Sequence, residues 1–518
     1  MKKFKAYSQE QLPIFPLDIS DLISEGHLVR VISQFVGGLS LDLLSKPFEK
    51  EGQPPYHPRM MMKVLLYAYS TKLFSTRKIE KALQQDITYM WISGMQKPDH
   101  NTINRFRGIY FKSVIEDVFT ELLDFLQANG YIKFETYFVD GTKIEANANK
   151  YSYVWKKNVE RNKEKLKHKV KLLLEEIDTL NATEDKIYGE ESLAELGKNN
   201  QIDSKKIKEV ADELNNKLKD KEKNKTQRTI KSRINKLTKA SEKLDKYEES
   251  EKILGKRNSY SKTDTDAVFM RMKDDTLKPA YNIQNSSENL FIVNVSVSQN
   301  PADNDPFVEH LETIKGRGEK YIPDNYVGDA AYGSEENYDA LESSKINSYL
   351  KYNSFDRDVT GKDTNPFSKN NMPYDEQKDC FICPMGKEII FVEDDITVTA
   401  RGYKSKSKVY KCENCTGCSF QEVCVKGKGN RIIRVRPQLE KLKQKAKENL
   451  LSQIGVEFRK RRGYEIETFF GDLKMNQGFR RFLLRGLEKI KIEANLLSIA
   501  YNLRKMNAIM NNKQIICG

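Results

Sequence analysis

The chain has 518 residues, and its 88 Lys and Arg against 74 Asp and Glu give a formal net charge of +14. An apolar content of 38% is sufficient for several packed domains and excludes an intrinsically disordered chain. The basic excess indicates a polyanionic partner. Since no apolar run reaches the roughly 18 residues of a membrane span, we expect a cytoplasmic protein that contacts no membrane.

The first 130 residues have the apolar periodicity of short helices, and Pro58 marks the first turn of one of them. Residues 99–107 predict another helix, capped at its start and carrying Arg105 and Arg107. This pattern suits the recognition element of a helix-turn-helix, and it also fits an ordinary capped surface helix. We expect residues 1–130 to form a helical DNA-binding domain in which both arginines contact DNA.

Residues 156–257 predict a helical insertion that resembles a coiled coil. The composition shifts there to Lys, Glu and Asn, and four apolar residues recur every seven positions: Val159, Leu166, Leu173 and Leu180. Further apolar periodicity indicates additional helices in the same insertion. Because acidic residues are interleaved with the basic ones, we expect solvated faces here rather than a DNA-binding surface.

An α/β pattern surrounds this insertion. Strands are expected at residues 137–140, 281–284, 290–297, 325–329 and 348–352, with a polar turn at 285–289 and helices near 305–314 and 334–341. This order is that of a ribonuclease H-like core, which we assign to residues 131–355. The topology would place Asp140, on the first strand, close to Asp329, at the end of the fourth. Taken alone, Asp140 followed by Gly141 is also a hairpin signal.

A cysteine-rich segment follows at residues 356–432, where the regular pattern stops. Its six cysteines are Cys380, Cys383, Cys412, Cys415, Cys418 and Cys424. Pairs at two-residue spacing predict a structural Zn²⁺ site, because thiolates from one tight turn can reach the same tetrahedral ion. Six thiols exceed four ligands, and the spacing leaves two sets open: Cys380, Cys383, Cys412 and Cys415, or Cys383, Cys415, Cys418 and Cys424. For Cys517, near the C-terminus, we expect no chemical role.

Residues 433–518 are helical and basic. An apolar stripe predicts a helix on which Glu467 and Lys474 lie seven residues, or two turns, apart on one flank. Considered alone, Glu467 fits a solvated helix glutamate. Three further arginines lie among aromatic and apolar residues, at Arg480, Arg481 and Arg485.

Motifs in this order resemble the DDE transposases of bacterial insertion sequences, in the subgroup with an N-terminal helical transposase domain. The resemblance covers nearly the whole chain, and its motifs are residues 56–60, 75–80, 99–107, 140–148, 281–284, 328–334 and 466–474, followed by Arg485 and Gly486. It implies that Asp140, Asp329 and Glu467 bind Mg²⁺ or Mn²⁺. It further implies that Lys474 contacts DNA near these carboxylates, while the basic C-terminal stretch helps to hold the DNA ends.

The chain departs from the family pattern in front of the glutamate. Related transposases often carry Tyr and Arg seven and four residues earlier, where this chain has Lys460 and Gly463. Counting from Glu465 instead recovers an arginine, but puts Asp472 in the place of the lysine. We therefore prefer Glu467 and keep Glu465 as the alternative, with Arg461 or Arg462 in place of the missing arginine.

The resemblance implies DNA cleavage at transposon ends followed by strand transfer into target DNA, through two-metal phosphodiester chemistry. The expected partners are terminal inverted repeats and target DNA, bound by a homodimer on paired ends in the bacterial nucleoid. Two alternatives stay open: a catalytically inactive or domesticated DNA-binding relative, and a metal-dependent nuclease without strand transfer.

Overall fold

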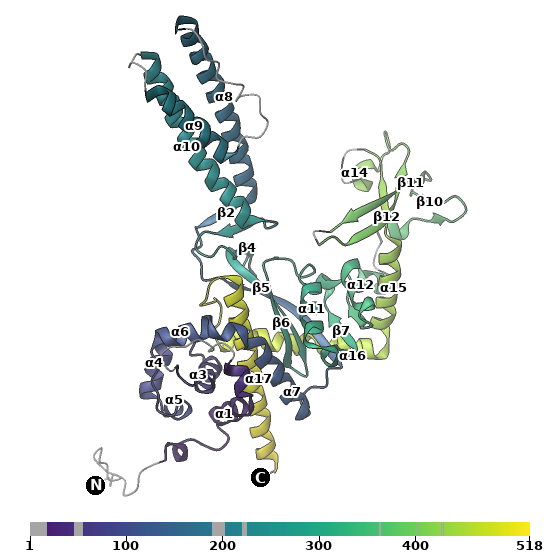
Figure 1. The fold of residues 1–518 in the computed structure, drawn as a ribbon. Helices are drawn as coiled ribbons and strands as arrows, with labels where there is room; N and C mark the ends of the chain where they lie inside the picture. The colour runs from purple at the N-terminus through teal and green to yellow at the C-terminus, as the bar shows by residue number, and fades with distance from the viewer. Residues whose placement is uncertain are drawn as a thin grey trace, which may run out of the picture. The chain divides into compact units, whose positions relative to one another are not determined.

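The structure is a computed structural model that describes most of the chain (Figure 1). The described residues are 18–45, 55–188, 203–219, 225–361, 364–399, 401–425, 427 and 429–517. The chain divides into two compact units. The first comprises residues 1–144, 282–484 and 488–518, and the second comprises residues 145–281 and 485–487.

Short helices form the N-terminal part of the first unit, as the periodicity predicts. Helix α3 is buried from Met60 to Ser70 and lies at the centre of this part. The carboxylate of Asp99 accepts the backbone N–H of Thr102 at 2.6 Å and caps α6. The helices are α1 (Leu28–Gly38), α2 (Leu41–Ser45), α3 (Pro58–Ser70), α4 (Thr76–Gln85), α5 (Ile87–Ile92), α6 (His100–Gly108) and α7 (Ile115–Ala128), with 3-10 turns η1 (Ile19–Leu22) and η3 (Tyr110–Ser113).

A mixed sheet forms the core of the first unit. Its strands are β1 (Thr136–Glu145), β5 (Leu277–Glu288), β6 (Phe291–Ser298), β7 (Asn325–Gly328) and β8 (Asn347–Leu350). They are ordered β6-β5-β1-β7-β8, and β1, β7 and β8 run parallel. The intervening helices are α11 (Phe307–Arg317), α12 (Glu335–Ser343) and α13 (Phe355–Thr360), with 3-10 turns η4 (Glu319–Tyr321), η5 (Ala330–Tyr332) and η6 (Lys369–Asn371).

The hairpin between β5 and β6 differs from the prediction. Strand β5 continues to Glu288, and only Asn289 and Leu290 form the turn, both with positive φ. The polar residues expected to make a longer turn have tertiary partners instead. The carboxylate of Glu288, for example, accepts the backbone N–H groups of residues 133–136 at 2.8–3.3 Å. Polarity here reflects buried hydrogen bonding rather than solvent exposure.

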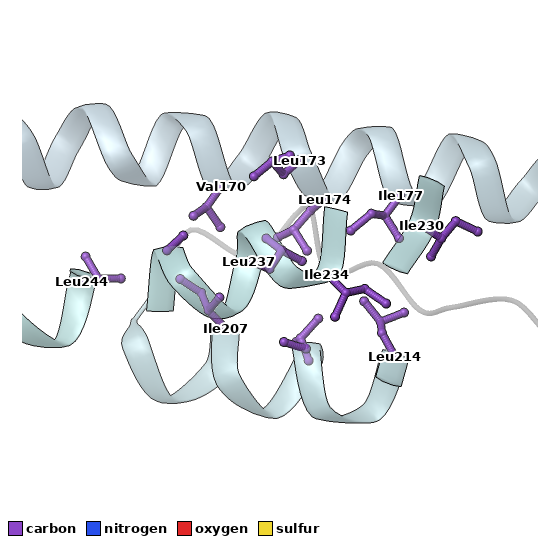
Figure 2. Close-up of a cluster of buried hydrophobic side chains, with 13 residues drawn as sticks. Val170, Leu173, Leu174, Ile177, Ile207, Leu214, Ile230, Ile234, Leu237 and Leu244 are labelled. Atoms are coloured by element: carbon purple, nitrogen blue, oxygen red, sulfur yellow. The ribbon is translucent and has the colours of Figure 1, made fainter. Parts of the chain in front are cut away.

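The second unit contains the predicted helical insertion, in which α10 packs against α8 and α9. One apolar cluster joins the three helices (Figure 2), in which Leu174 and Ile177 of α8 point toward Leu237 and Ile234 of α10. The expected seven-residue repeat therefore buries a seam within the insertion. The elements are α8 (Lys156–Tyr188), α9 (Ser204–Lys219), α10 (Lys225–Leu254), the pair β2 (Tyr153–Trp155) and β3 (Ser259–Ser261), and β4 (Val268–Arg271), which pairs with residues 277–280.

The cysteine-rich segment forms a five-stranded antiparallel sheet, whereas its sequence predicted irregular structure. The order is β13-β12-β11-β10-β9. Most of β11 is exposed and polar, with Asp394 opposite Lys408, so the apolar alternation that marks a strand is missing. The elements are β9 (Tyr374–Asp375), β10 (Cys380–Ile382), β11 (Glu388–Val398), β12 (Lys404–Cys412), α14 (Gln421–Cys424) and β13 (Ile432–Val435).

The C-terminal part is helical, as predicted. It comprises α15 (Pro437–Leu451), α16 (Gln453–Gly471), a π-helical turn η7 (Asp472–Asn476) and α17 (Leu487–Cys517). Ile466, Phe469 and Leu473 of the predicted apolar stripe are buried. Within the described part of the chain, no helix has the length and apolar character needed to cross a membrane. The side chain of Cys517 lies outside the described residues.

Candidate active site

Strands β1 and β7 bring Asp140 and Asp329 to neighbouring positions. In this parallel pair Phe138 lies opposite Val327, and extending the register by two residues puts Asp140 opposite Asp329. Adjacent strands lie about 4.8 Å apart, so the two side chains share one edge of the sheet. Strand β1 continues to Glu145, so Asp140 is a strand residue and the hairpin reading of the Asp-Gly pair is wrong.

The carboxylate of Asp140 is destabilised in its charged form. Its pKa is raised to about 6, chiefly by burial and also by the negative charges of Asp329 and Asp303, whereas the backbone N–H of Gly141 and the charge of Arg462 act to lower it. The N–H of Gly141 donates to Asp140 Oδ1 at 2.8 Å. Asp329 accepts the backbone N–H of Ala331 at 2.9 Å and caps η5. This end of the sheet therefore concentrates negative charge.

Asp303, on the loop between β6 and α11, was missed by the sequence reasoning. Its Oδ1 accepts Asn282 Nδ2 at 2.8 Å and Gln284 Nε2 at 3.0 Å. Gln284 Oε1 accepts the hydroxyl of Tyr332, which ends η5. Two polar residues on an otherwise buried strand could have indicated such a network, since buried polar groups need partners. Asp303 itself follows a polar stretch without periodicity and gave no signal.

Helix α16 covers the face of the sheet to which Asp140 points. Side chains alternate along a strand, so Phe138 and Asp140 share one face. The ring of Phe458 lies 6.0 Å from that of Phe138, and the guanidinium of Arg461 lies 5.2 Å from the centre of the same ring. Arg462, the next residue, is the one whose charge acts on Asp140.

The two candidate glutamates of α16 have different surroundings. Glu465 is 2% exposed, accepts the backbone N–H of Leu290 at 2.7 Å and forms an ion pair with Arg461 at 2.8 Å. Glu467 is exposed, and its side chain makes no hydrogen bond or ion pair with the residues that the structure describes. Asp140 and Asp329 thus lie together, whereas Glu467 is not joined to them.

Lys474 contacts strand β1 beyond Asp140. Its Nζ donates to Thr142 Oγ1 at 2.5 Å and to the carbonyl of Lys143 at 3.1 Å. By strand alternation, Thr142 shares the face of Asp140. A cationic side chain is therefore held on the same face of β1 as the predicted catalytic aspartate.

Across the described ranges, no three His, Cys, Asp or Glu side chains are arranged to enclose a metal ion. The donors around Asp140 are carboxylate oxygens, which are the ligands that Mg²⁺ and Mn²⁺ prefer. A carboxylate whose pKa is raised chiefly by burial and also by like charges would be stabilised by a cation. The chemistry of this donor set therefore fits a divalent ion.

The cysteines separate into two groups. Cys380 lies in β10 with its side chain on the opposite face from that of Phe381, which packs in the apolar core of the five-stranded sheet. The other five thiols line one small cavity: Cys383, Cys412, Cys415, Cys418 and Cys424. Backbone N–H groups of Lys387 and Arg431 lie 3.3 and 3.4 Å from the sulfurs of Cys383 and Cys415.

The two arginines of α6 differ in exposure. Arg105 is exposed and, with Asn101, Asn104 and Lys489, lines a cavity of about 400 Å³. Arg107 is 4% exposed and donates to Tyr69, Asn104 and the carbonyl of Phe74 at 3.0–3.2 Å. This burial leaves Arg107 no surface for a phosphate, so its predicted DNA contact is corrected to a role in packing.

The three arginines that follow η7 are exposed. Arg480 donates to the sulfur of Met475 at 4.0 Å, and Arg485, in the second unit, donates to the carbonyl of Asn147 at 2.7 Å. Arg481 also has interactions within the described chain. Their guanidinium groups are accessible to solvent and so to a polyanion.

Two family comparisons match the chain. Residues 382–507 match the family of transposase DDE domains, and residues 17–108 match the transposase domain (DUF772) family. Both matches support an insertion-sequence DDE transposase. No curated protein and no solved structure matches it.

The two transposase matches cover different parts of the site. The DDE-domain match contains Glu467, Lys474 and the five cysteines from Cys383 to Cys424, and the N-terminal match contains α6 with Arg105. Asp140 and Asp329 lie between the two matched ranges. Their assignment therefore depends on the structure and not on a family match: on the register of β1 and β7, and on the effect of the Asp329 charge on the pKa of Asp140.

Proposed function

We propose that this transposase cleaves DNA at transposon ends and transfers the resulting strand into target DNA, with Asp140, Asp329 and Glu467 as its metal-binding carboxylates. The observation that carries the proposal is the neighbouring position of Asp140, within β1, and Asp329, directly after β7, in a parallel pair of strands. Two carboxylates from distant segments converge there in a basic protein with two transposase family matches.

We further propose that residues 131–355 form a ribonuclease H-like core interrupted by the insertion at 156–257. The strand order β6-β5-β1-β7-β8, with β1, β7 and β8 parallel, supports this assignment. Residues 1–130, 356–432 and 433–518 would then be the helical DNA-binding domain, the cysteine-rich insertion and the C-terminal catalytic helix with its basic region.

Glu467 is the better candidate for the third carboxylate. The oxygens of Glu465 are already bound by Leu290 and Arg461, and its burial leaves no access for a metal. Glu467 is exposed and has no hydrogen bond or ion pair with the described residues, so its carboxylate is available to a metal, and Lys474, seven residues later, contacts the face of β1 that carries Asp140. Arg462 takes the place of the missing arginine, because its charge acts on Asp140.

Mg²⁺ or Mn²⁺, when bound, would supply Lewis-acid activation of a water or 3′-hydroxyl nucleophile and stabilisation of the leaving oxygen. Asp140 and Asp329 would hold the ion, and Asp140 must be ionised to do so. Lys474 would contact a DNA phosphate from its position beside Thr142. Arg462 would offset part of the negative charge around Asp140.

DNA would be held mainly through phosphates, with some sequence reading by α6. Asn101, Asn104 and Arg105 line one cavity with Lys489, and these amide and guanidinium groups are the donors and acceptors that read base edges. The exposed Arg480, Arg481 and Arg485 would add phosphate contacts. We propose a homodimer that pairs two transposon ends.

We also propose that zinc, when bound, is held by four of the five thiols that line the cysteine cavity. The sulfurs of Cys383 and Cys415 already accept the backbone N–H groups of Lys387 and Arg431, contacts that would orient these two ligands around the ion. Cys380 is excluded because it does not line that cavity. This arrangement favours the set Cys383, Cys415, Cys418 and Cys424 over the set that includes Cys380.

A joining assay tests the function, using labelled DNA ends taken from inverted repeats that flank the gene and a target plasmid. The proposal requires joined products with Mg²⁺ or Mn²⁺, and their loss in Asp140→Asn, Asp329→Asn and Glu467→Gln while end binding persists. Cleavage without joining would indicate a nuclease, and binding without cleavage an inactive relative. Loss of joining in Glu465→Gln with full activity in Glu467→Gln would move the third carboxylate to Glu465.

A further inference from the structure

Asp303 holds an unusual position beside the two aspartates. Only one of its carboxylate oxygens is used, since Oδ1 accepts both Asn282 Nδ2 at 2.8 Å and Gln284 Nε2 at 3.0 Å. Its Oδ2 accepts no hydrogen bond from the described residues. The amides of Asn282 and Gln284 thus fix the side chain of Asp303 through Oδ1, and Oδ2 stays available to a ligand.

The same network reaches both predicted metal ligands. A Cβ added to Gly141, the residue after Asp140, would lie 2.5 Å from Asp303 Oδ1, so this carboxylate packs directly against β1. On the other side, Gln284 accepts the hydroxyl of Tyr332, which lies three residues after Asp329 and is fully buried. Asp303 is therefore tied through one glutamine to the turn that follows Asp329.

A purely structural cluster would not need an anion here. The amides of Asn282 and Gln284 require an acceptor oxygen, which a neutral asparagine at position 303 would also provide. A carboxylate instead adds a third negative charge beside Asp140 and Asp329, and like charges so close are unfavourable unless a cation binds among them. The negative charge of Asp303 therefore lowers the stability of the metal-free fold and strengthens the binding of a cation.

We propose that Asp303 is a positioning residue of the divalent-metal site, whose charge strengthens cation binding by Asp140 and Asp329 and whose hydrogen bonds to Asn282 and Gln284 fix its carboxylate beside them. The inference rests on the proposed function in one respect, because it takes these two aspartates as the metal ligands.

The test is a titration of the full-length protein with Mn²⁺, in which the electron paramagnetic resonance signal of free Mn²⁺ measures how much of the ion is bound. Asp303→Asn keeps an acceptor oxygen for both amides and removes only the charge, so its thermal unfolding midpoint should not fall. Its Mn²⁺ dissociation constant should rise about tenfold. The matched control is Asp305→Asn, which makes the same charge change on the same loop at an exposed residue bonded to Asn300, and it should stay within about twofold of wild type.

Unchanged Mn²⁺ affinity in Asp303→Asn would overturn the inference and leave Asp303 as a structural hydrogen-bond acceptor. An equal loss of affinity in Asp305→Asn would also overturn it, by showing a general effect of net charge. The joining assay is a separate readout. If the wild type joins no DNA while Asp303→Asn alone weakens Mn²⁺ binding, the proposed function fails and the inference stands.

Discussion

Replacing Asp140 with asparagine should stabilise the metal-free protein while abolishing its metal-dependent chemistry. A carboxyl with a pKa of about 6, against its ordinary 3.8, costs the folded state about 3 kcal/mol once it is ionised. Asparagine removes that charge and keeps an oxygen that can accept the N–H of Gly141. We expect Asp140→Asn to gain up to about 3 kcal/mol of unfolding free energy at pH 8.

The pH dependence has a defined direction. Because the folded-state pKa lies above the unfolded one, the folded protein holds this proton more tightly, and stability falls as pH rises from about 4 to about 6. The cost is absent below pH 4 and complete above about pH 7. The advantage of Asp140→Asn should therefore vanish near pH 4.

Tryptophan fluorescence can report the unfolding of the first unit alone. Trp91 lies in the first unit and Trp155 in the second, and they are the two tryptophans of the chain. In a Trp155→Phe background, denaturant unfolding at pH 8 and near pH 4, with and without Mg²⁺, gives the required comparison. Mg²⁺ should stabilise the protein with Asp140 and not the Asp140→Asn variant. Equal stability of the two proteins at pH 8, or a gain that persists at pH 4, would refute the electrostatic reasoning.

Three further outcomes are expected. Glu465→Gln should lower the unfolding free energy by about 2 kcal/mol, through loss of its charged hydrogen bonds, and should retain DNA joining when folded; loss of joining in a folded variant would contradict this. Arg105→Ala should weaken binding to transposon-end DNA and, in a gel-shift titration, reduce the slope of log affinity against log salt concentration by about one. Arg107→Ala should instead lower the unfolding free energy by about 3 kcal/mol, because it leaves a buried acceptor network around Tyr69 unpaired. Elemental analysis should find about one Zn²⁺ per chain, lost in Cys383→Ser and retained in Cys380→Ser; zinc-free folded protein would rule the site out.

Much of the fold follows from patterns that are local in the sequence. Pro58 and Asp99 mark helix starts because helix ends need particular side chains near the backbone, and both helices form as expected. The seven-residue repeat predicts the seam of the insertion, because it places apolar side chains on one stripe of a helix. The pairing of Asp140 with Asp329 was predictable as well, since each follows a run of apolar strand residues and the two runs lie side by side in a parallel pair.

Other structural features depend on contacts between residues that are distant in sequence. For these features, the local sequence pattern gave wrong predictions. The polar end of β5 predicted a turn, yet Glu288 is buried against the backbone before β1. The exposed ribbon β11 lacks the alternation of a half-buried strand, so its sheet went unpredicted. Arg107 has the sequence signature of a surface arginine, but its guanidinium satisfies groups from other helices.

The sequence by itself therefore determined most helices and core strands, the resemblance to the transposases and the pairing of Asp140 with Asp329, since periodicity, caps and motifs act over a few residues. Only the tertiary structure decided that Glu465 is a buried ion-pair partner, that Asp303 belongs beside Asp140, and that Cys380 stands apart from the other thiols. The physical reason is that a polar side chain has the same local signature whether water or a distant buried group satisfies it. Its role is settled when the fold supplies the partner.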